Sequence, residues 1–184
     1  MNHLIFTDTE TGGLDPKHHE ILTVALVDWR DGQIGDTVEW KVKARPEFVS
    51  PQALAVNGID LAEHNAQALD QKIVVREITA WCRAHWLSGE RVRLGGHNVA
   101  FDVGFLSHMI GPLYYRAFHH RPVCTMNMLP LLWHAGIIPN DVGKLTEACA
   151  AFGVPLPAAE AHTALGDALA SARLYTAMLK RVWP

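Results

Sequence analysis

Several features common in secreted and membrane proteins are missing from this sequence. No apolar run approaches the roughly 20 residues that a helix needs to cross a bilayer. The N-terminus, Met1-Asn2-His3, lacks the positive segment and long apolar stretch of a secretion signal. The three cysteines, Cys82, Cys124 and Cys149, are widely spaced and form no C-x-x-C pair, which indicates reduced thiols and neither a disulfide framework nor a zinc site. We therefore expect a cytoplasmic protein with no membrane contact.

Internal repeats, low-complexity tracts and long linkers are also absent. The 184 residues are 49% apolar and 19% charged, a composition that suits a single folded domain over residues 1–184 with a full core. The formal net charge is −3, so the chain lacks the basic excess of a protein that coats nucleic acid. This charge does not exclude an enzyme that holds a few nucleotides through metal ions.

The order of apolar patterns predicts an α/β domain. A continuous apolar run at Leu4-Ile5-Phe6 indicates a central strand buried on both faces. The next two strands flank Asp31-Gly32 and should form an antiparallel hairpin. Shorter strands then alternate with helices, so we expect a five-stranded mixed sheet, an antiparallel meander followed by parallel strands, with helices on its faces.

The expected element bounds follow from periodicity and from breaking residues. The first expected strand contains the apolar run 4–6 and is ended by Gly12-Gly13, and the other expected strands are 21–29, 37–43, 92–96 and 122–125. The expected helices are a short one after Pro51, 72–86, one from about residue 101, one ending at 133, 144–152 and 163–181. The inner stripe of the last helix is expected at Leu165, Leu169, Ala172 and Leu179.

A pair of acids stands at the end of the first buried strand. Because strand side chains alternate, Asp8 and Glu10 should point to the same face as Leu4 and Phe6. Two adjacent carboxylates repel each other, and a divalent cation relieves that conflict. Ligands that are all oxygen favour Mg²⁺ or Mn²⁺ over zinc. Taken alone, the pair favours the plainer alternative, in which both acids have left the sheet and face water.

Further acids stand where helices are expected to begin. Asp102 follows a predicted strand and starts a helix, which is where parallel α/β sheets bind ligands. His162 and Asp167 are five residues apart, about 140° around a helix, so they converge only if His162 precedes the helix that Thr163 caps. The plainer alternatives are helix-start acids that favour the dipole and a surface histidine, one of 11 in the chain.

Together these residues resemble the DEDDh, or DnaQ-like, family of 3′–5′ exonucleases, which includes the proofreading subunit of bacterial DNA polymerase III and exonuclease X. The three matching motifs are Asp8-Thr9-Glu10-Thr11-Gly12-Gly13-Leu14, His97-Asn98-Val99-Ala100-Phe101-Asp102 and His162-Thr163-Ala164-Leu165-Gly166-Asp167. The resemblance covers nearly the whole chain. It implies an RNase H-like fold, and the chain ends after the last helix, so we expect a stand-alone nuclease.

The resemblance also implies roles for these residues. Asp8, Glu10, Asp102 and Asp167 would hold two Mg²⁺ or Mn²⁺ ions, and His162 would take the proton from the attacking water. The products would be nucleoside 5′-monophosphates. The expected substrate-binding residues are Thr11, Gly12, Leu14, Gln52, Asn57 and Asn98. Leu14 can equally be a core leucine after a turn, and Asn98 can equally cap the next helix.

The expected partner is a single-stranded 3′ end, with DNA favoured over RNA. Two alternatives are an exoribonuclease that trims RNA ends and a non-catalytic module that binds nucleic-acid ends. The oligomeric state is left open. Seven basic residues could track phosphates, and a solvated surface is the favoured interpretation for most of them: Lys41, Lys43, Arg45, Arg91, Arg93, Arg116 and Arg121. The pairs His18-His19 and His119-His120 are interpreted as structural or incidental.

Overall fold

The computed structural model describes residues 3–86, 91–156 and 163–183. Within these residues lies a five-stranded sheet with the order β3-β2-β1-β4-β5. β1, β2 and β3 pair antiparallel, whereas β4 runs parallel to both β1 and β5. The strand bounds are β1 His3–Thr11, β2 Ile21–Arg30, β3 Gln33–Lys41, β4 Leu94–Gly96 and β5 Val123–Cys124. The expected mixed sheet of an antiparallel meander and parallel strands is confirmed.

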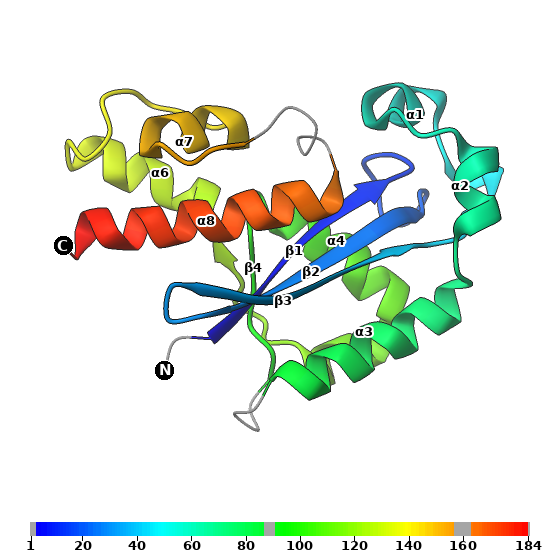
Figure 1. Cartoon of the computed structure of the whole chain (residues 1–184). Helices are drawn as coiled ribbons and strands as arrows, with labels where there is room; N and C mark the ends of the chain where they lie inside the picture. Colours follow the sequence, from blue (N-terminus) through cyan, green and yellow to red (C-terminus); the bar gives the residue numbers. More distant parts are fainter. Residues whose placement is uncertain (1–2, 87–90, 157–162, 184) are drawn as a thin grey trace.

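Helices cover both faces of this sheet (Figure 1). On one face lies α8 (Ala164–Val182), with α6 (Thr125–His134) and α7 (Leu145–Phe152) beside it. On the other face lie α3 (Gln71–His85) and α4 (Ala100–Ile110). Shorter helices occupy the connections: η1 Pro46–Phe48, α1 Pro51–Asn57, α2 Leu61–Gln67, η2 Gly111–Leu113 and α5 Tyr114–Ala117. In the described part of the chain, no helix is long and apolar enough to span a membrane.

Alternation along β1 divides its side chains between two cores. Leu4 and Phe6 pack toward α8, whereas Ile5 packs with the residues of α3 and α4. The same alternation sends Asp8 and Glu10 toward the α8 face.

The inner stripe of α8 differs from the expectation. The fully buried residues that pack against the sheet are Ala164, Ala168 and Ala172, while the expected Leu165, Leu169 and Leu179 are only partly buried at the flanks. The four expected residues all contact this core, but of them only Ala172 is fully buried. Small side chains at the contact let the helix axis come close to the strands, and a pattern of large apolar residues does not reveal that choice.

The β2–β3 hairpin is tighter than expected because β3 begins at Gln33 and not at residue 37. Asp31 and Gly32 both have positive φ, 47° and 89°, as a two-residue hairpin turn requires. The register shifts between Val27 and Trp29, so the strand continues past an irregularity. At that point a Cβ on Gly35 would lie 2.8 Å from Oδ2 of Asp28.

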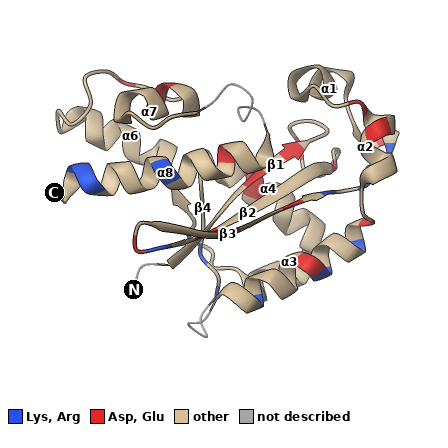
Figure 2. Ribbon diagram, in the orientation of Figure 1, with Lys and Arg blue, Asp and Glu red and all other residues tan. Residues whose placement is uncertain are grey.

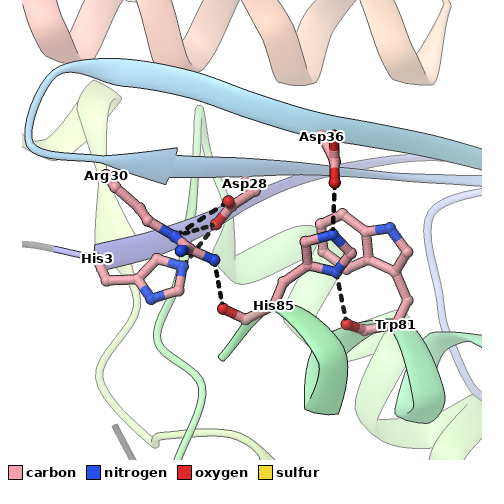
Figure 3. Close-up of polar contacts among 6 residues, drawn as sticks. All are labelled: His3, Asp28, Arg30, Asp36, Trp81 and His85. Carbon is pink, nitrogen blue, oxygen red and sulfur yellow. Dashed lines mark hydrogen bonds and ion pairs between the residues drawn. The ribbon is translucent and has the colours of Figure 1, made fainter. Parts of the chain in front are cut away.

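A polar network holds the N-terminal end of β1 (Figure 3). The buried Asp28 lies 2.6 Å from Nε2 of His3 and 3.1 Å from Nε of Arg30. Arg30 also donates to the backbone oxygen of His85 at the end of α3, at 2.6 Å. His85 in turn contacts Asp36 on β3 at 3.0 Å. This network connects β1, β2, β3 and α3 near the N-terminal end of β1, whereas the motif acids lie at its C-terminal end.

Candidate active site

The first motif lies where β1 ends. Asp8 pairs with Ala25 and Glu10 with Thr23 on β2, so both acids are still within the sheet. The alternative in which they have left the sheet is therefore wrong. Both carboxylates project on the α8 face beyond the apolar part of the strand.

The second motif begins a helix on the other face of the sheet. Asp102 lies in the first turn of α4 and is 3% exposed. The residue at the N-cap position is Val99, and no side chain there caps the helix. Asp102 instead accepts a 2.7 Å hydrogen bond from the hydroxyl of Thr9 on β1. The helix thereby brings a third carboxylate to the end of the same strand.

The third motif starts α8. The Thr163 hydroxyl accepts from the backbone N–H of Gly166 at 3.1 Å, and the N–H of Asp167 bonds to the Thr163 carbonyl at 2.9 Å. The expected cap is therefore confirmed, and Asp167 lies in the first turn. Glu39 of β3 accepts from the N–H of Leu165 at 3.1 Å and connects the helix start to the sheet. His162 lies outside the described residues.

These segments meet at one edge of the sheet, where the acidic parts of β1, α4 and α8 gather (Figure 2). A pocket of about 200 Å³ opens there. Its walls combine the four motif acids with neighbouring side chains: Asp8, Thr9, Glu10, Val56, Asn57, His97, Asn98, Phe101, Asp102 and Asp167. Residues 159 positions apart in sequence thus face one space, as the three motifs together predict.

The electrostatics of the pocket are those of crowded carboxylates. Burial is the main cause that raises the pKa of Asp8 well above its usual value, and Asp102, Asp167 and Glu10 raise it further. Burial and neighbouring carboxylates, Asp167 first, also raise the pKa of Glu10 to about 7. Burial raises the pKa of Asp102 to about 7, although hydrogen bonds from Thr9 act in the opposite direction. Negative charge in this pocket is therefore costly.

The donor set suits a hard cation. All four acids offer oxygen, the ligand that Mg²⁺ and Mn²⁺ prefer. Among the described residues, no Lys or Arg forms an ion pair with Asp8, Glu10 or Asp102. Within the same residues, no three His, Cys, Asp or Glu side chains already converge closely enough to hold a metal, in line with mutual repulsion. A divalent cation would supply the missing positive charge.

Three of the expected substrate residues have structural partners. The Thr11 hydroxyl donates to the carbonyl of Gly13 at 2.8 Å and is buried. A Cβ on Gly12 would lie 2.6 Å from the carbonyl oxygen of Phe48, so this glycine permits close backbone packing. The Asn57 amide donates to the carbonyl of Thr11 at 3.0 Å and also faces the pocket.

The other three candidates are exposed. Leu14 is 85% exposed, so the interpretation as a core leucine is wrong. Asn98 lines the pocket in a left-handed conformation, φ 58°, and its side chain does not cap α4. Gln52 is exposed in the first turn of α1 and is not among the residues that line the pocket.

Sequence reasoning did not single out four residues of the pocket: Thr9, Val56, His97 and Phe101. Val56 is 77% exposed although it is large and apolar. His97 contacts the hydroxyl of Thr125 at 2.9 Å and the carbonyl of Gly143 at 2.8 Å, and burial lowers its pKa. His97 thus connects the end of β4 to the segment before α7. Three of these four residues stand inside the quoted motifs, which was the available signal.

The basic candidates lie outside the pocket. Lys41 donates to Gln67 at 2.7 Å, and Arg45 pairs with Glu20 at 2.6 Å. His18 contacts Asp15, in keeping with a structural interpretation of that pair. The rings of His119 and His120 stack on each other, with centroids 4.6 Å apart.

Comparison with known proteins places this geometry in a family. The model of the RNase_T exonuclease family matches residues 5–175. Ribonuclease T of Shewanella baltica is 28% identical over 185 residues, which cover 96% of this chain and 81% of that protein.

Solved structures show the same fold. Exonuclease I from Methylocaldum szegediense superposes with a TM-score of 0.81 at 21% identity. The zinc-bound E. coli exonuclease I complex with single-stranded DNA superposes with a TM-score of 0.75 at 17% identity. Each match covers 98% of this chain and 41% of the exonuclease I chain, so this chain spans about two fifths of those proteins. The chain has the RNase H-like fold and belongs to the RNase_T exonuclease family, the DnaQ-like 3′–5′ exonucleases of the DEDDh type.

Proposed function

We propose that residues 1–184 act as one exonuclease domain that removes nucleotides singly from the 3′ end of single-stranded nucleic acid, with DNA as the preferred polymer. The observation that carries this proposal is the pocket that four carboxylates from three distant motifs line. Such a pocket repels a phosphodiester unless cations occupy it. The reaction therefore depends on divalent metal.

Asp8, Glu10, Asp102 and Asp167 are the residues that would hold two Mg²⁺ or Mn²⁺ ions. When bound, such ions supply a nucleophilic water at neutral pH and neutralise charge on the scissile phosphate. The protein contributes the fixed placement of the ligands. Asp8 and Glu10 are held by β1, and Asp167 by the capped start of α8.

The proton of the attacking water needs an acceptor, and His162 is the proposed one. An unperturbed imidazole has a pKa of about 6.5, so it can accept a proton at neutral pH. His162 directly precedes Thr163, the N-cap of the helix that carries Asp167. In the sequence, the histidine is therefore the residue directly before the start of the helix that carries Asp167.

The terminal nucleotide would rest on two exposed apolar residues, Val56 in the wall of the pocket and Leu14 shortly after β1. Val56 lines the pocket and Leu14 stands three residues past the end of β1, and both present large apolar surface to solvent. Asn57 and Asn98 add amide groups at the same place. These groups suit a base and a sugar more than a protein core.

The polymer is the finer part of the proposal. Exonuclease I, whose fold this chain shares, has been crystallised with single-stranded DNA. A second candidate, RNA, is favoured by the name of the relatives that match over most of their length, ribonuclease T. The two polymers differ by the 2′-hydroxyl, which a site reads by direct contact.

One experiment tests both points. DNA and RNA oligonucleotides of matched sequence, labelled at the 5′ end, are incubated with the protein and Mg²⁺ or Mn²⁺, with EDTA as the control. We expect a ladder that shortens from the 3′ end, faster for DNA, and no cleavage in EDTA. Faster shortening of RNA would reverse the polymer assignment. Binding of ends without cleavage would leave only a non-catalytic end-binding module.

A further inference from the structure

Two buried threonines on the same face of β1 differ in one contact. Thr7 and Thr9 are 0% and 6% exposed, and alternation sends both side chains away from Asp8 and Glu10. The Thr9 hydroxyl donates to Oδ1 of Asp102 at 2.7 Å. Within the described residues, the buried hydroxyl of Thr7 has no hydrogen-bond partner.

The contact of Thr9 determines how Asp102 meets the pocket. Asp102 is almost fully buried in the first turn of α4, where no side chain at the N-cap position bonds to the helix. Its Oδ1 is held by a hydroxyl from another element, 93 residues away in the sequence. A short hydrogen bond to a carboxylate is among the stronger ones in proteins and has a defined direction.

We propose that Thr9 is a positioning residue that orients the carboxylate of Asp102 for divalent cation binding in the acid pocket. This inference rests on the proposed function. It gives β1 a role on both of its faces. The strand presents Asp8 and Glu10 directly on one face, and through Thr9 it aligns Asp102 from the other. The positions of three of the four acids then depend on one strand, β1, which is paired with a neighbouring strand on each side.

The test compares Thr9→Val with Thr9→Ser. Valine keeps the branched shape and the strand preference but removes the hydroxyl, and serine keeps the hydroxyl. Mn²⁺ affinity is measured by titration calorimetry without substrate, and kcat and KM are measured on a DNA oligonucleotide. For Thr9→Val we expect about 10- to 100-fold weaker Mn²⁺ binding and a similar fall in kcat, with KM unchanged. Thr9→Ser should restore both quantities.

Thr7→Val is the matched control, because it makes the same chemical change on the same strand face, at a hydroxyl that has no partner in the described part of the chain. Mn²⁺ affinity and kcat should stay at wild-type values, and thermal stability in EDTA should not fall. Equal Mn²⁺ affinity in Thr9→Val and Thr7→Val would overturn the inference. So would a Thr9→Ser variant as impaired as Thr9→Val, since packing and not the hydroxyl would then be responsible.

Two further measurements keep the result clear. Thermal unfolding in EDTA shows whether Thr9→Val is folded, and Thr9→Ala provides a second variant without the hydroxyl. If the wild-type protein binds Mn²⁺ but cleaves neither DNA nor RNA, the proposed function fails while the calorimetry still decides the role of Thr9. If the wild-type protein cleaves and Thr9→Val matches it in both affinity and kcat, only the role of Thr9 fails.

Discussion

The carboxylates at the two ends of β1 have opposite electrostatic surroundings. At the N-terminal end, Asp28 pairs across from Ile5 and is surrounded by the cationic or polar groups of His3 and Arg30 (Figure 3). At the C-terminal end, Asp8 has as its charged neighbours Glu10 and two further acids of the pocket. A similar group is compensated at one end of the strand and crowded at the other.

The difference separates a structural carboxylate from a binding one. A buried acid with partners in the protein stabilises the fold only as long as those partners remain. Buried acids whose neighbours are other acids lower the stability of the fold, and a bound cation would relieve their repulsion. The negative charge is concentrated at the carboxyl ends of β1 and β4. In sheets with parallel strands, ligands bind at this end of the strands.

The largest effect is expected from removing an acid of the pocket. Asp167→Ala or Asp8→Ala should lower Mg²⁺-dependent cleavage by at least about 1,000-fold, equivalent to about 4 kcal/mol of transition-state stabilisation. Each variant should remain folded in EDTA, because the change removes one of several like charges. Cleavage kinetics and thermal unfolding are the measurements. Normal degradation by Asp167→Ala would end the assignment of this pocket as the active site.

The next effect concerns the proposed proton acceptor. His162→Ala should lose about 100- to 10,000-fold in kcat, because a positioned base contributes that much, while binding of the oligonucleotide persists. Single-turnover rates and fluorescence anisotropy separate the two quantities. His119→Ala is the control, because His119 lies outside the acid pocket. Full turnover by His162→Ala would place the base elsewhere.

The opposite end of β1 should respond in stability and not in catalysis. Asp28→Ala leaves His3 and Arg30 without their shared partner and should cost about 3 kcal/mol of unfolding free energy. Urea unfolding measures this loss, and kcat per folded molecule should be unchanged. A variant with wild-type stability would show that the contacts of Asp28 with His3 and Arg30 do not contribute to the free energy of unfolding.

The smallest effect is a pH dependence of the metal-free protein. The pKa values of Glu10 and Asp102 are raised to about 7, so between their usual values and 7 the folded state binds more protons than the unfolded state. Stability in EDTA should therefore fall as the pH rises from about 5 to about 8. Asp102→Asn should show a smaller fall in melting temperature over this range. Saturating Mn²⁺ should oppose the fall in the wild type, and an equal decline with and without metal would argue against cation binding here.

Much of the fold was predictable because the signals were local. Asp31-Gly32 between two apolar strands specifies a tight hairpin, and Thr163 marks the start of α8. The early start of β3 was missed because its first residues, Gln33 to Asp36, lack regular alternation around an irregular register. The helix α2 was missed although Asp60 accepts from the N–H of Glu63 at its start. Its seven residues are too few for a clear periodic pattern.

The candidate site was predictable in its acids and less so in its walls. Asp8, Glu10, Asp102 and Asp167 stand in motifs with defined spacing, and the structure places all four at one pocket. Val56 could not be separated from other apolar residues of a helix without its exposure. The bond of the Thr11 hydroxyl to the adjacent turn could not be predicted either, because it depends on the local backbone; its substrate role stays a prediction.

By itself, the sequence indicated the family and the identity of the acids through its three motifs. It indicated the sheet through the apolar runs and the turn at Asp31-Gly32. Each of these signals lies within a few neighbouring positions, so it can be read without the fold. Only the tertiary structure decided which face of β1 meets which helix, that Thr9 reaches Asp102, and that Asp28 is compensated while Asp8 is not. Burial and electrostatic interaction depend on distances between segments far apart in the chain, and those distances exist only after folding.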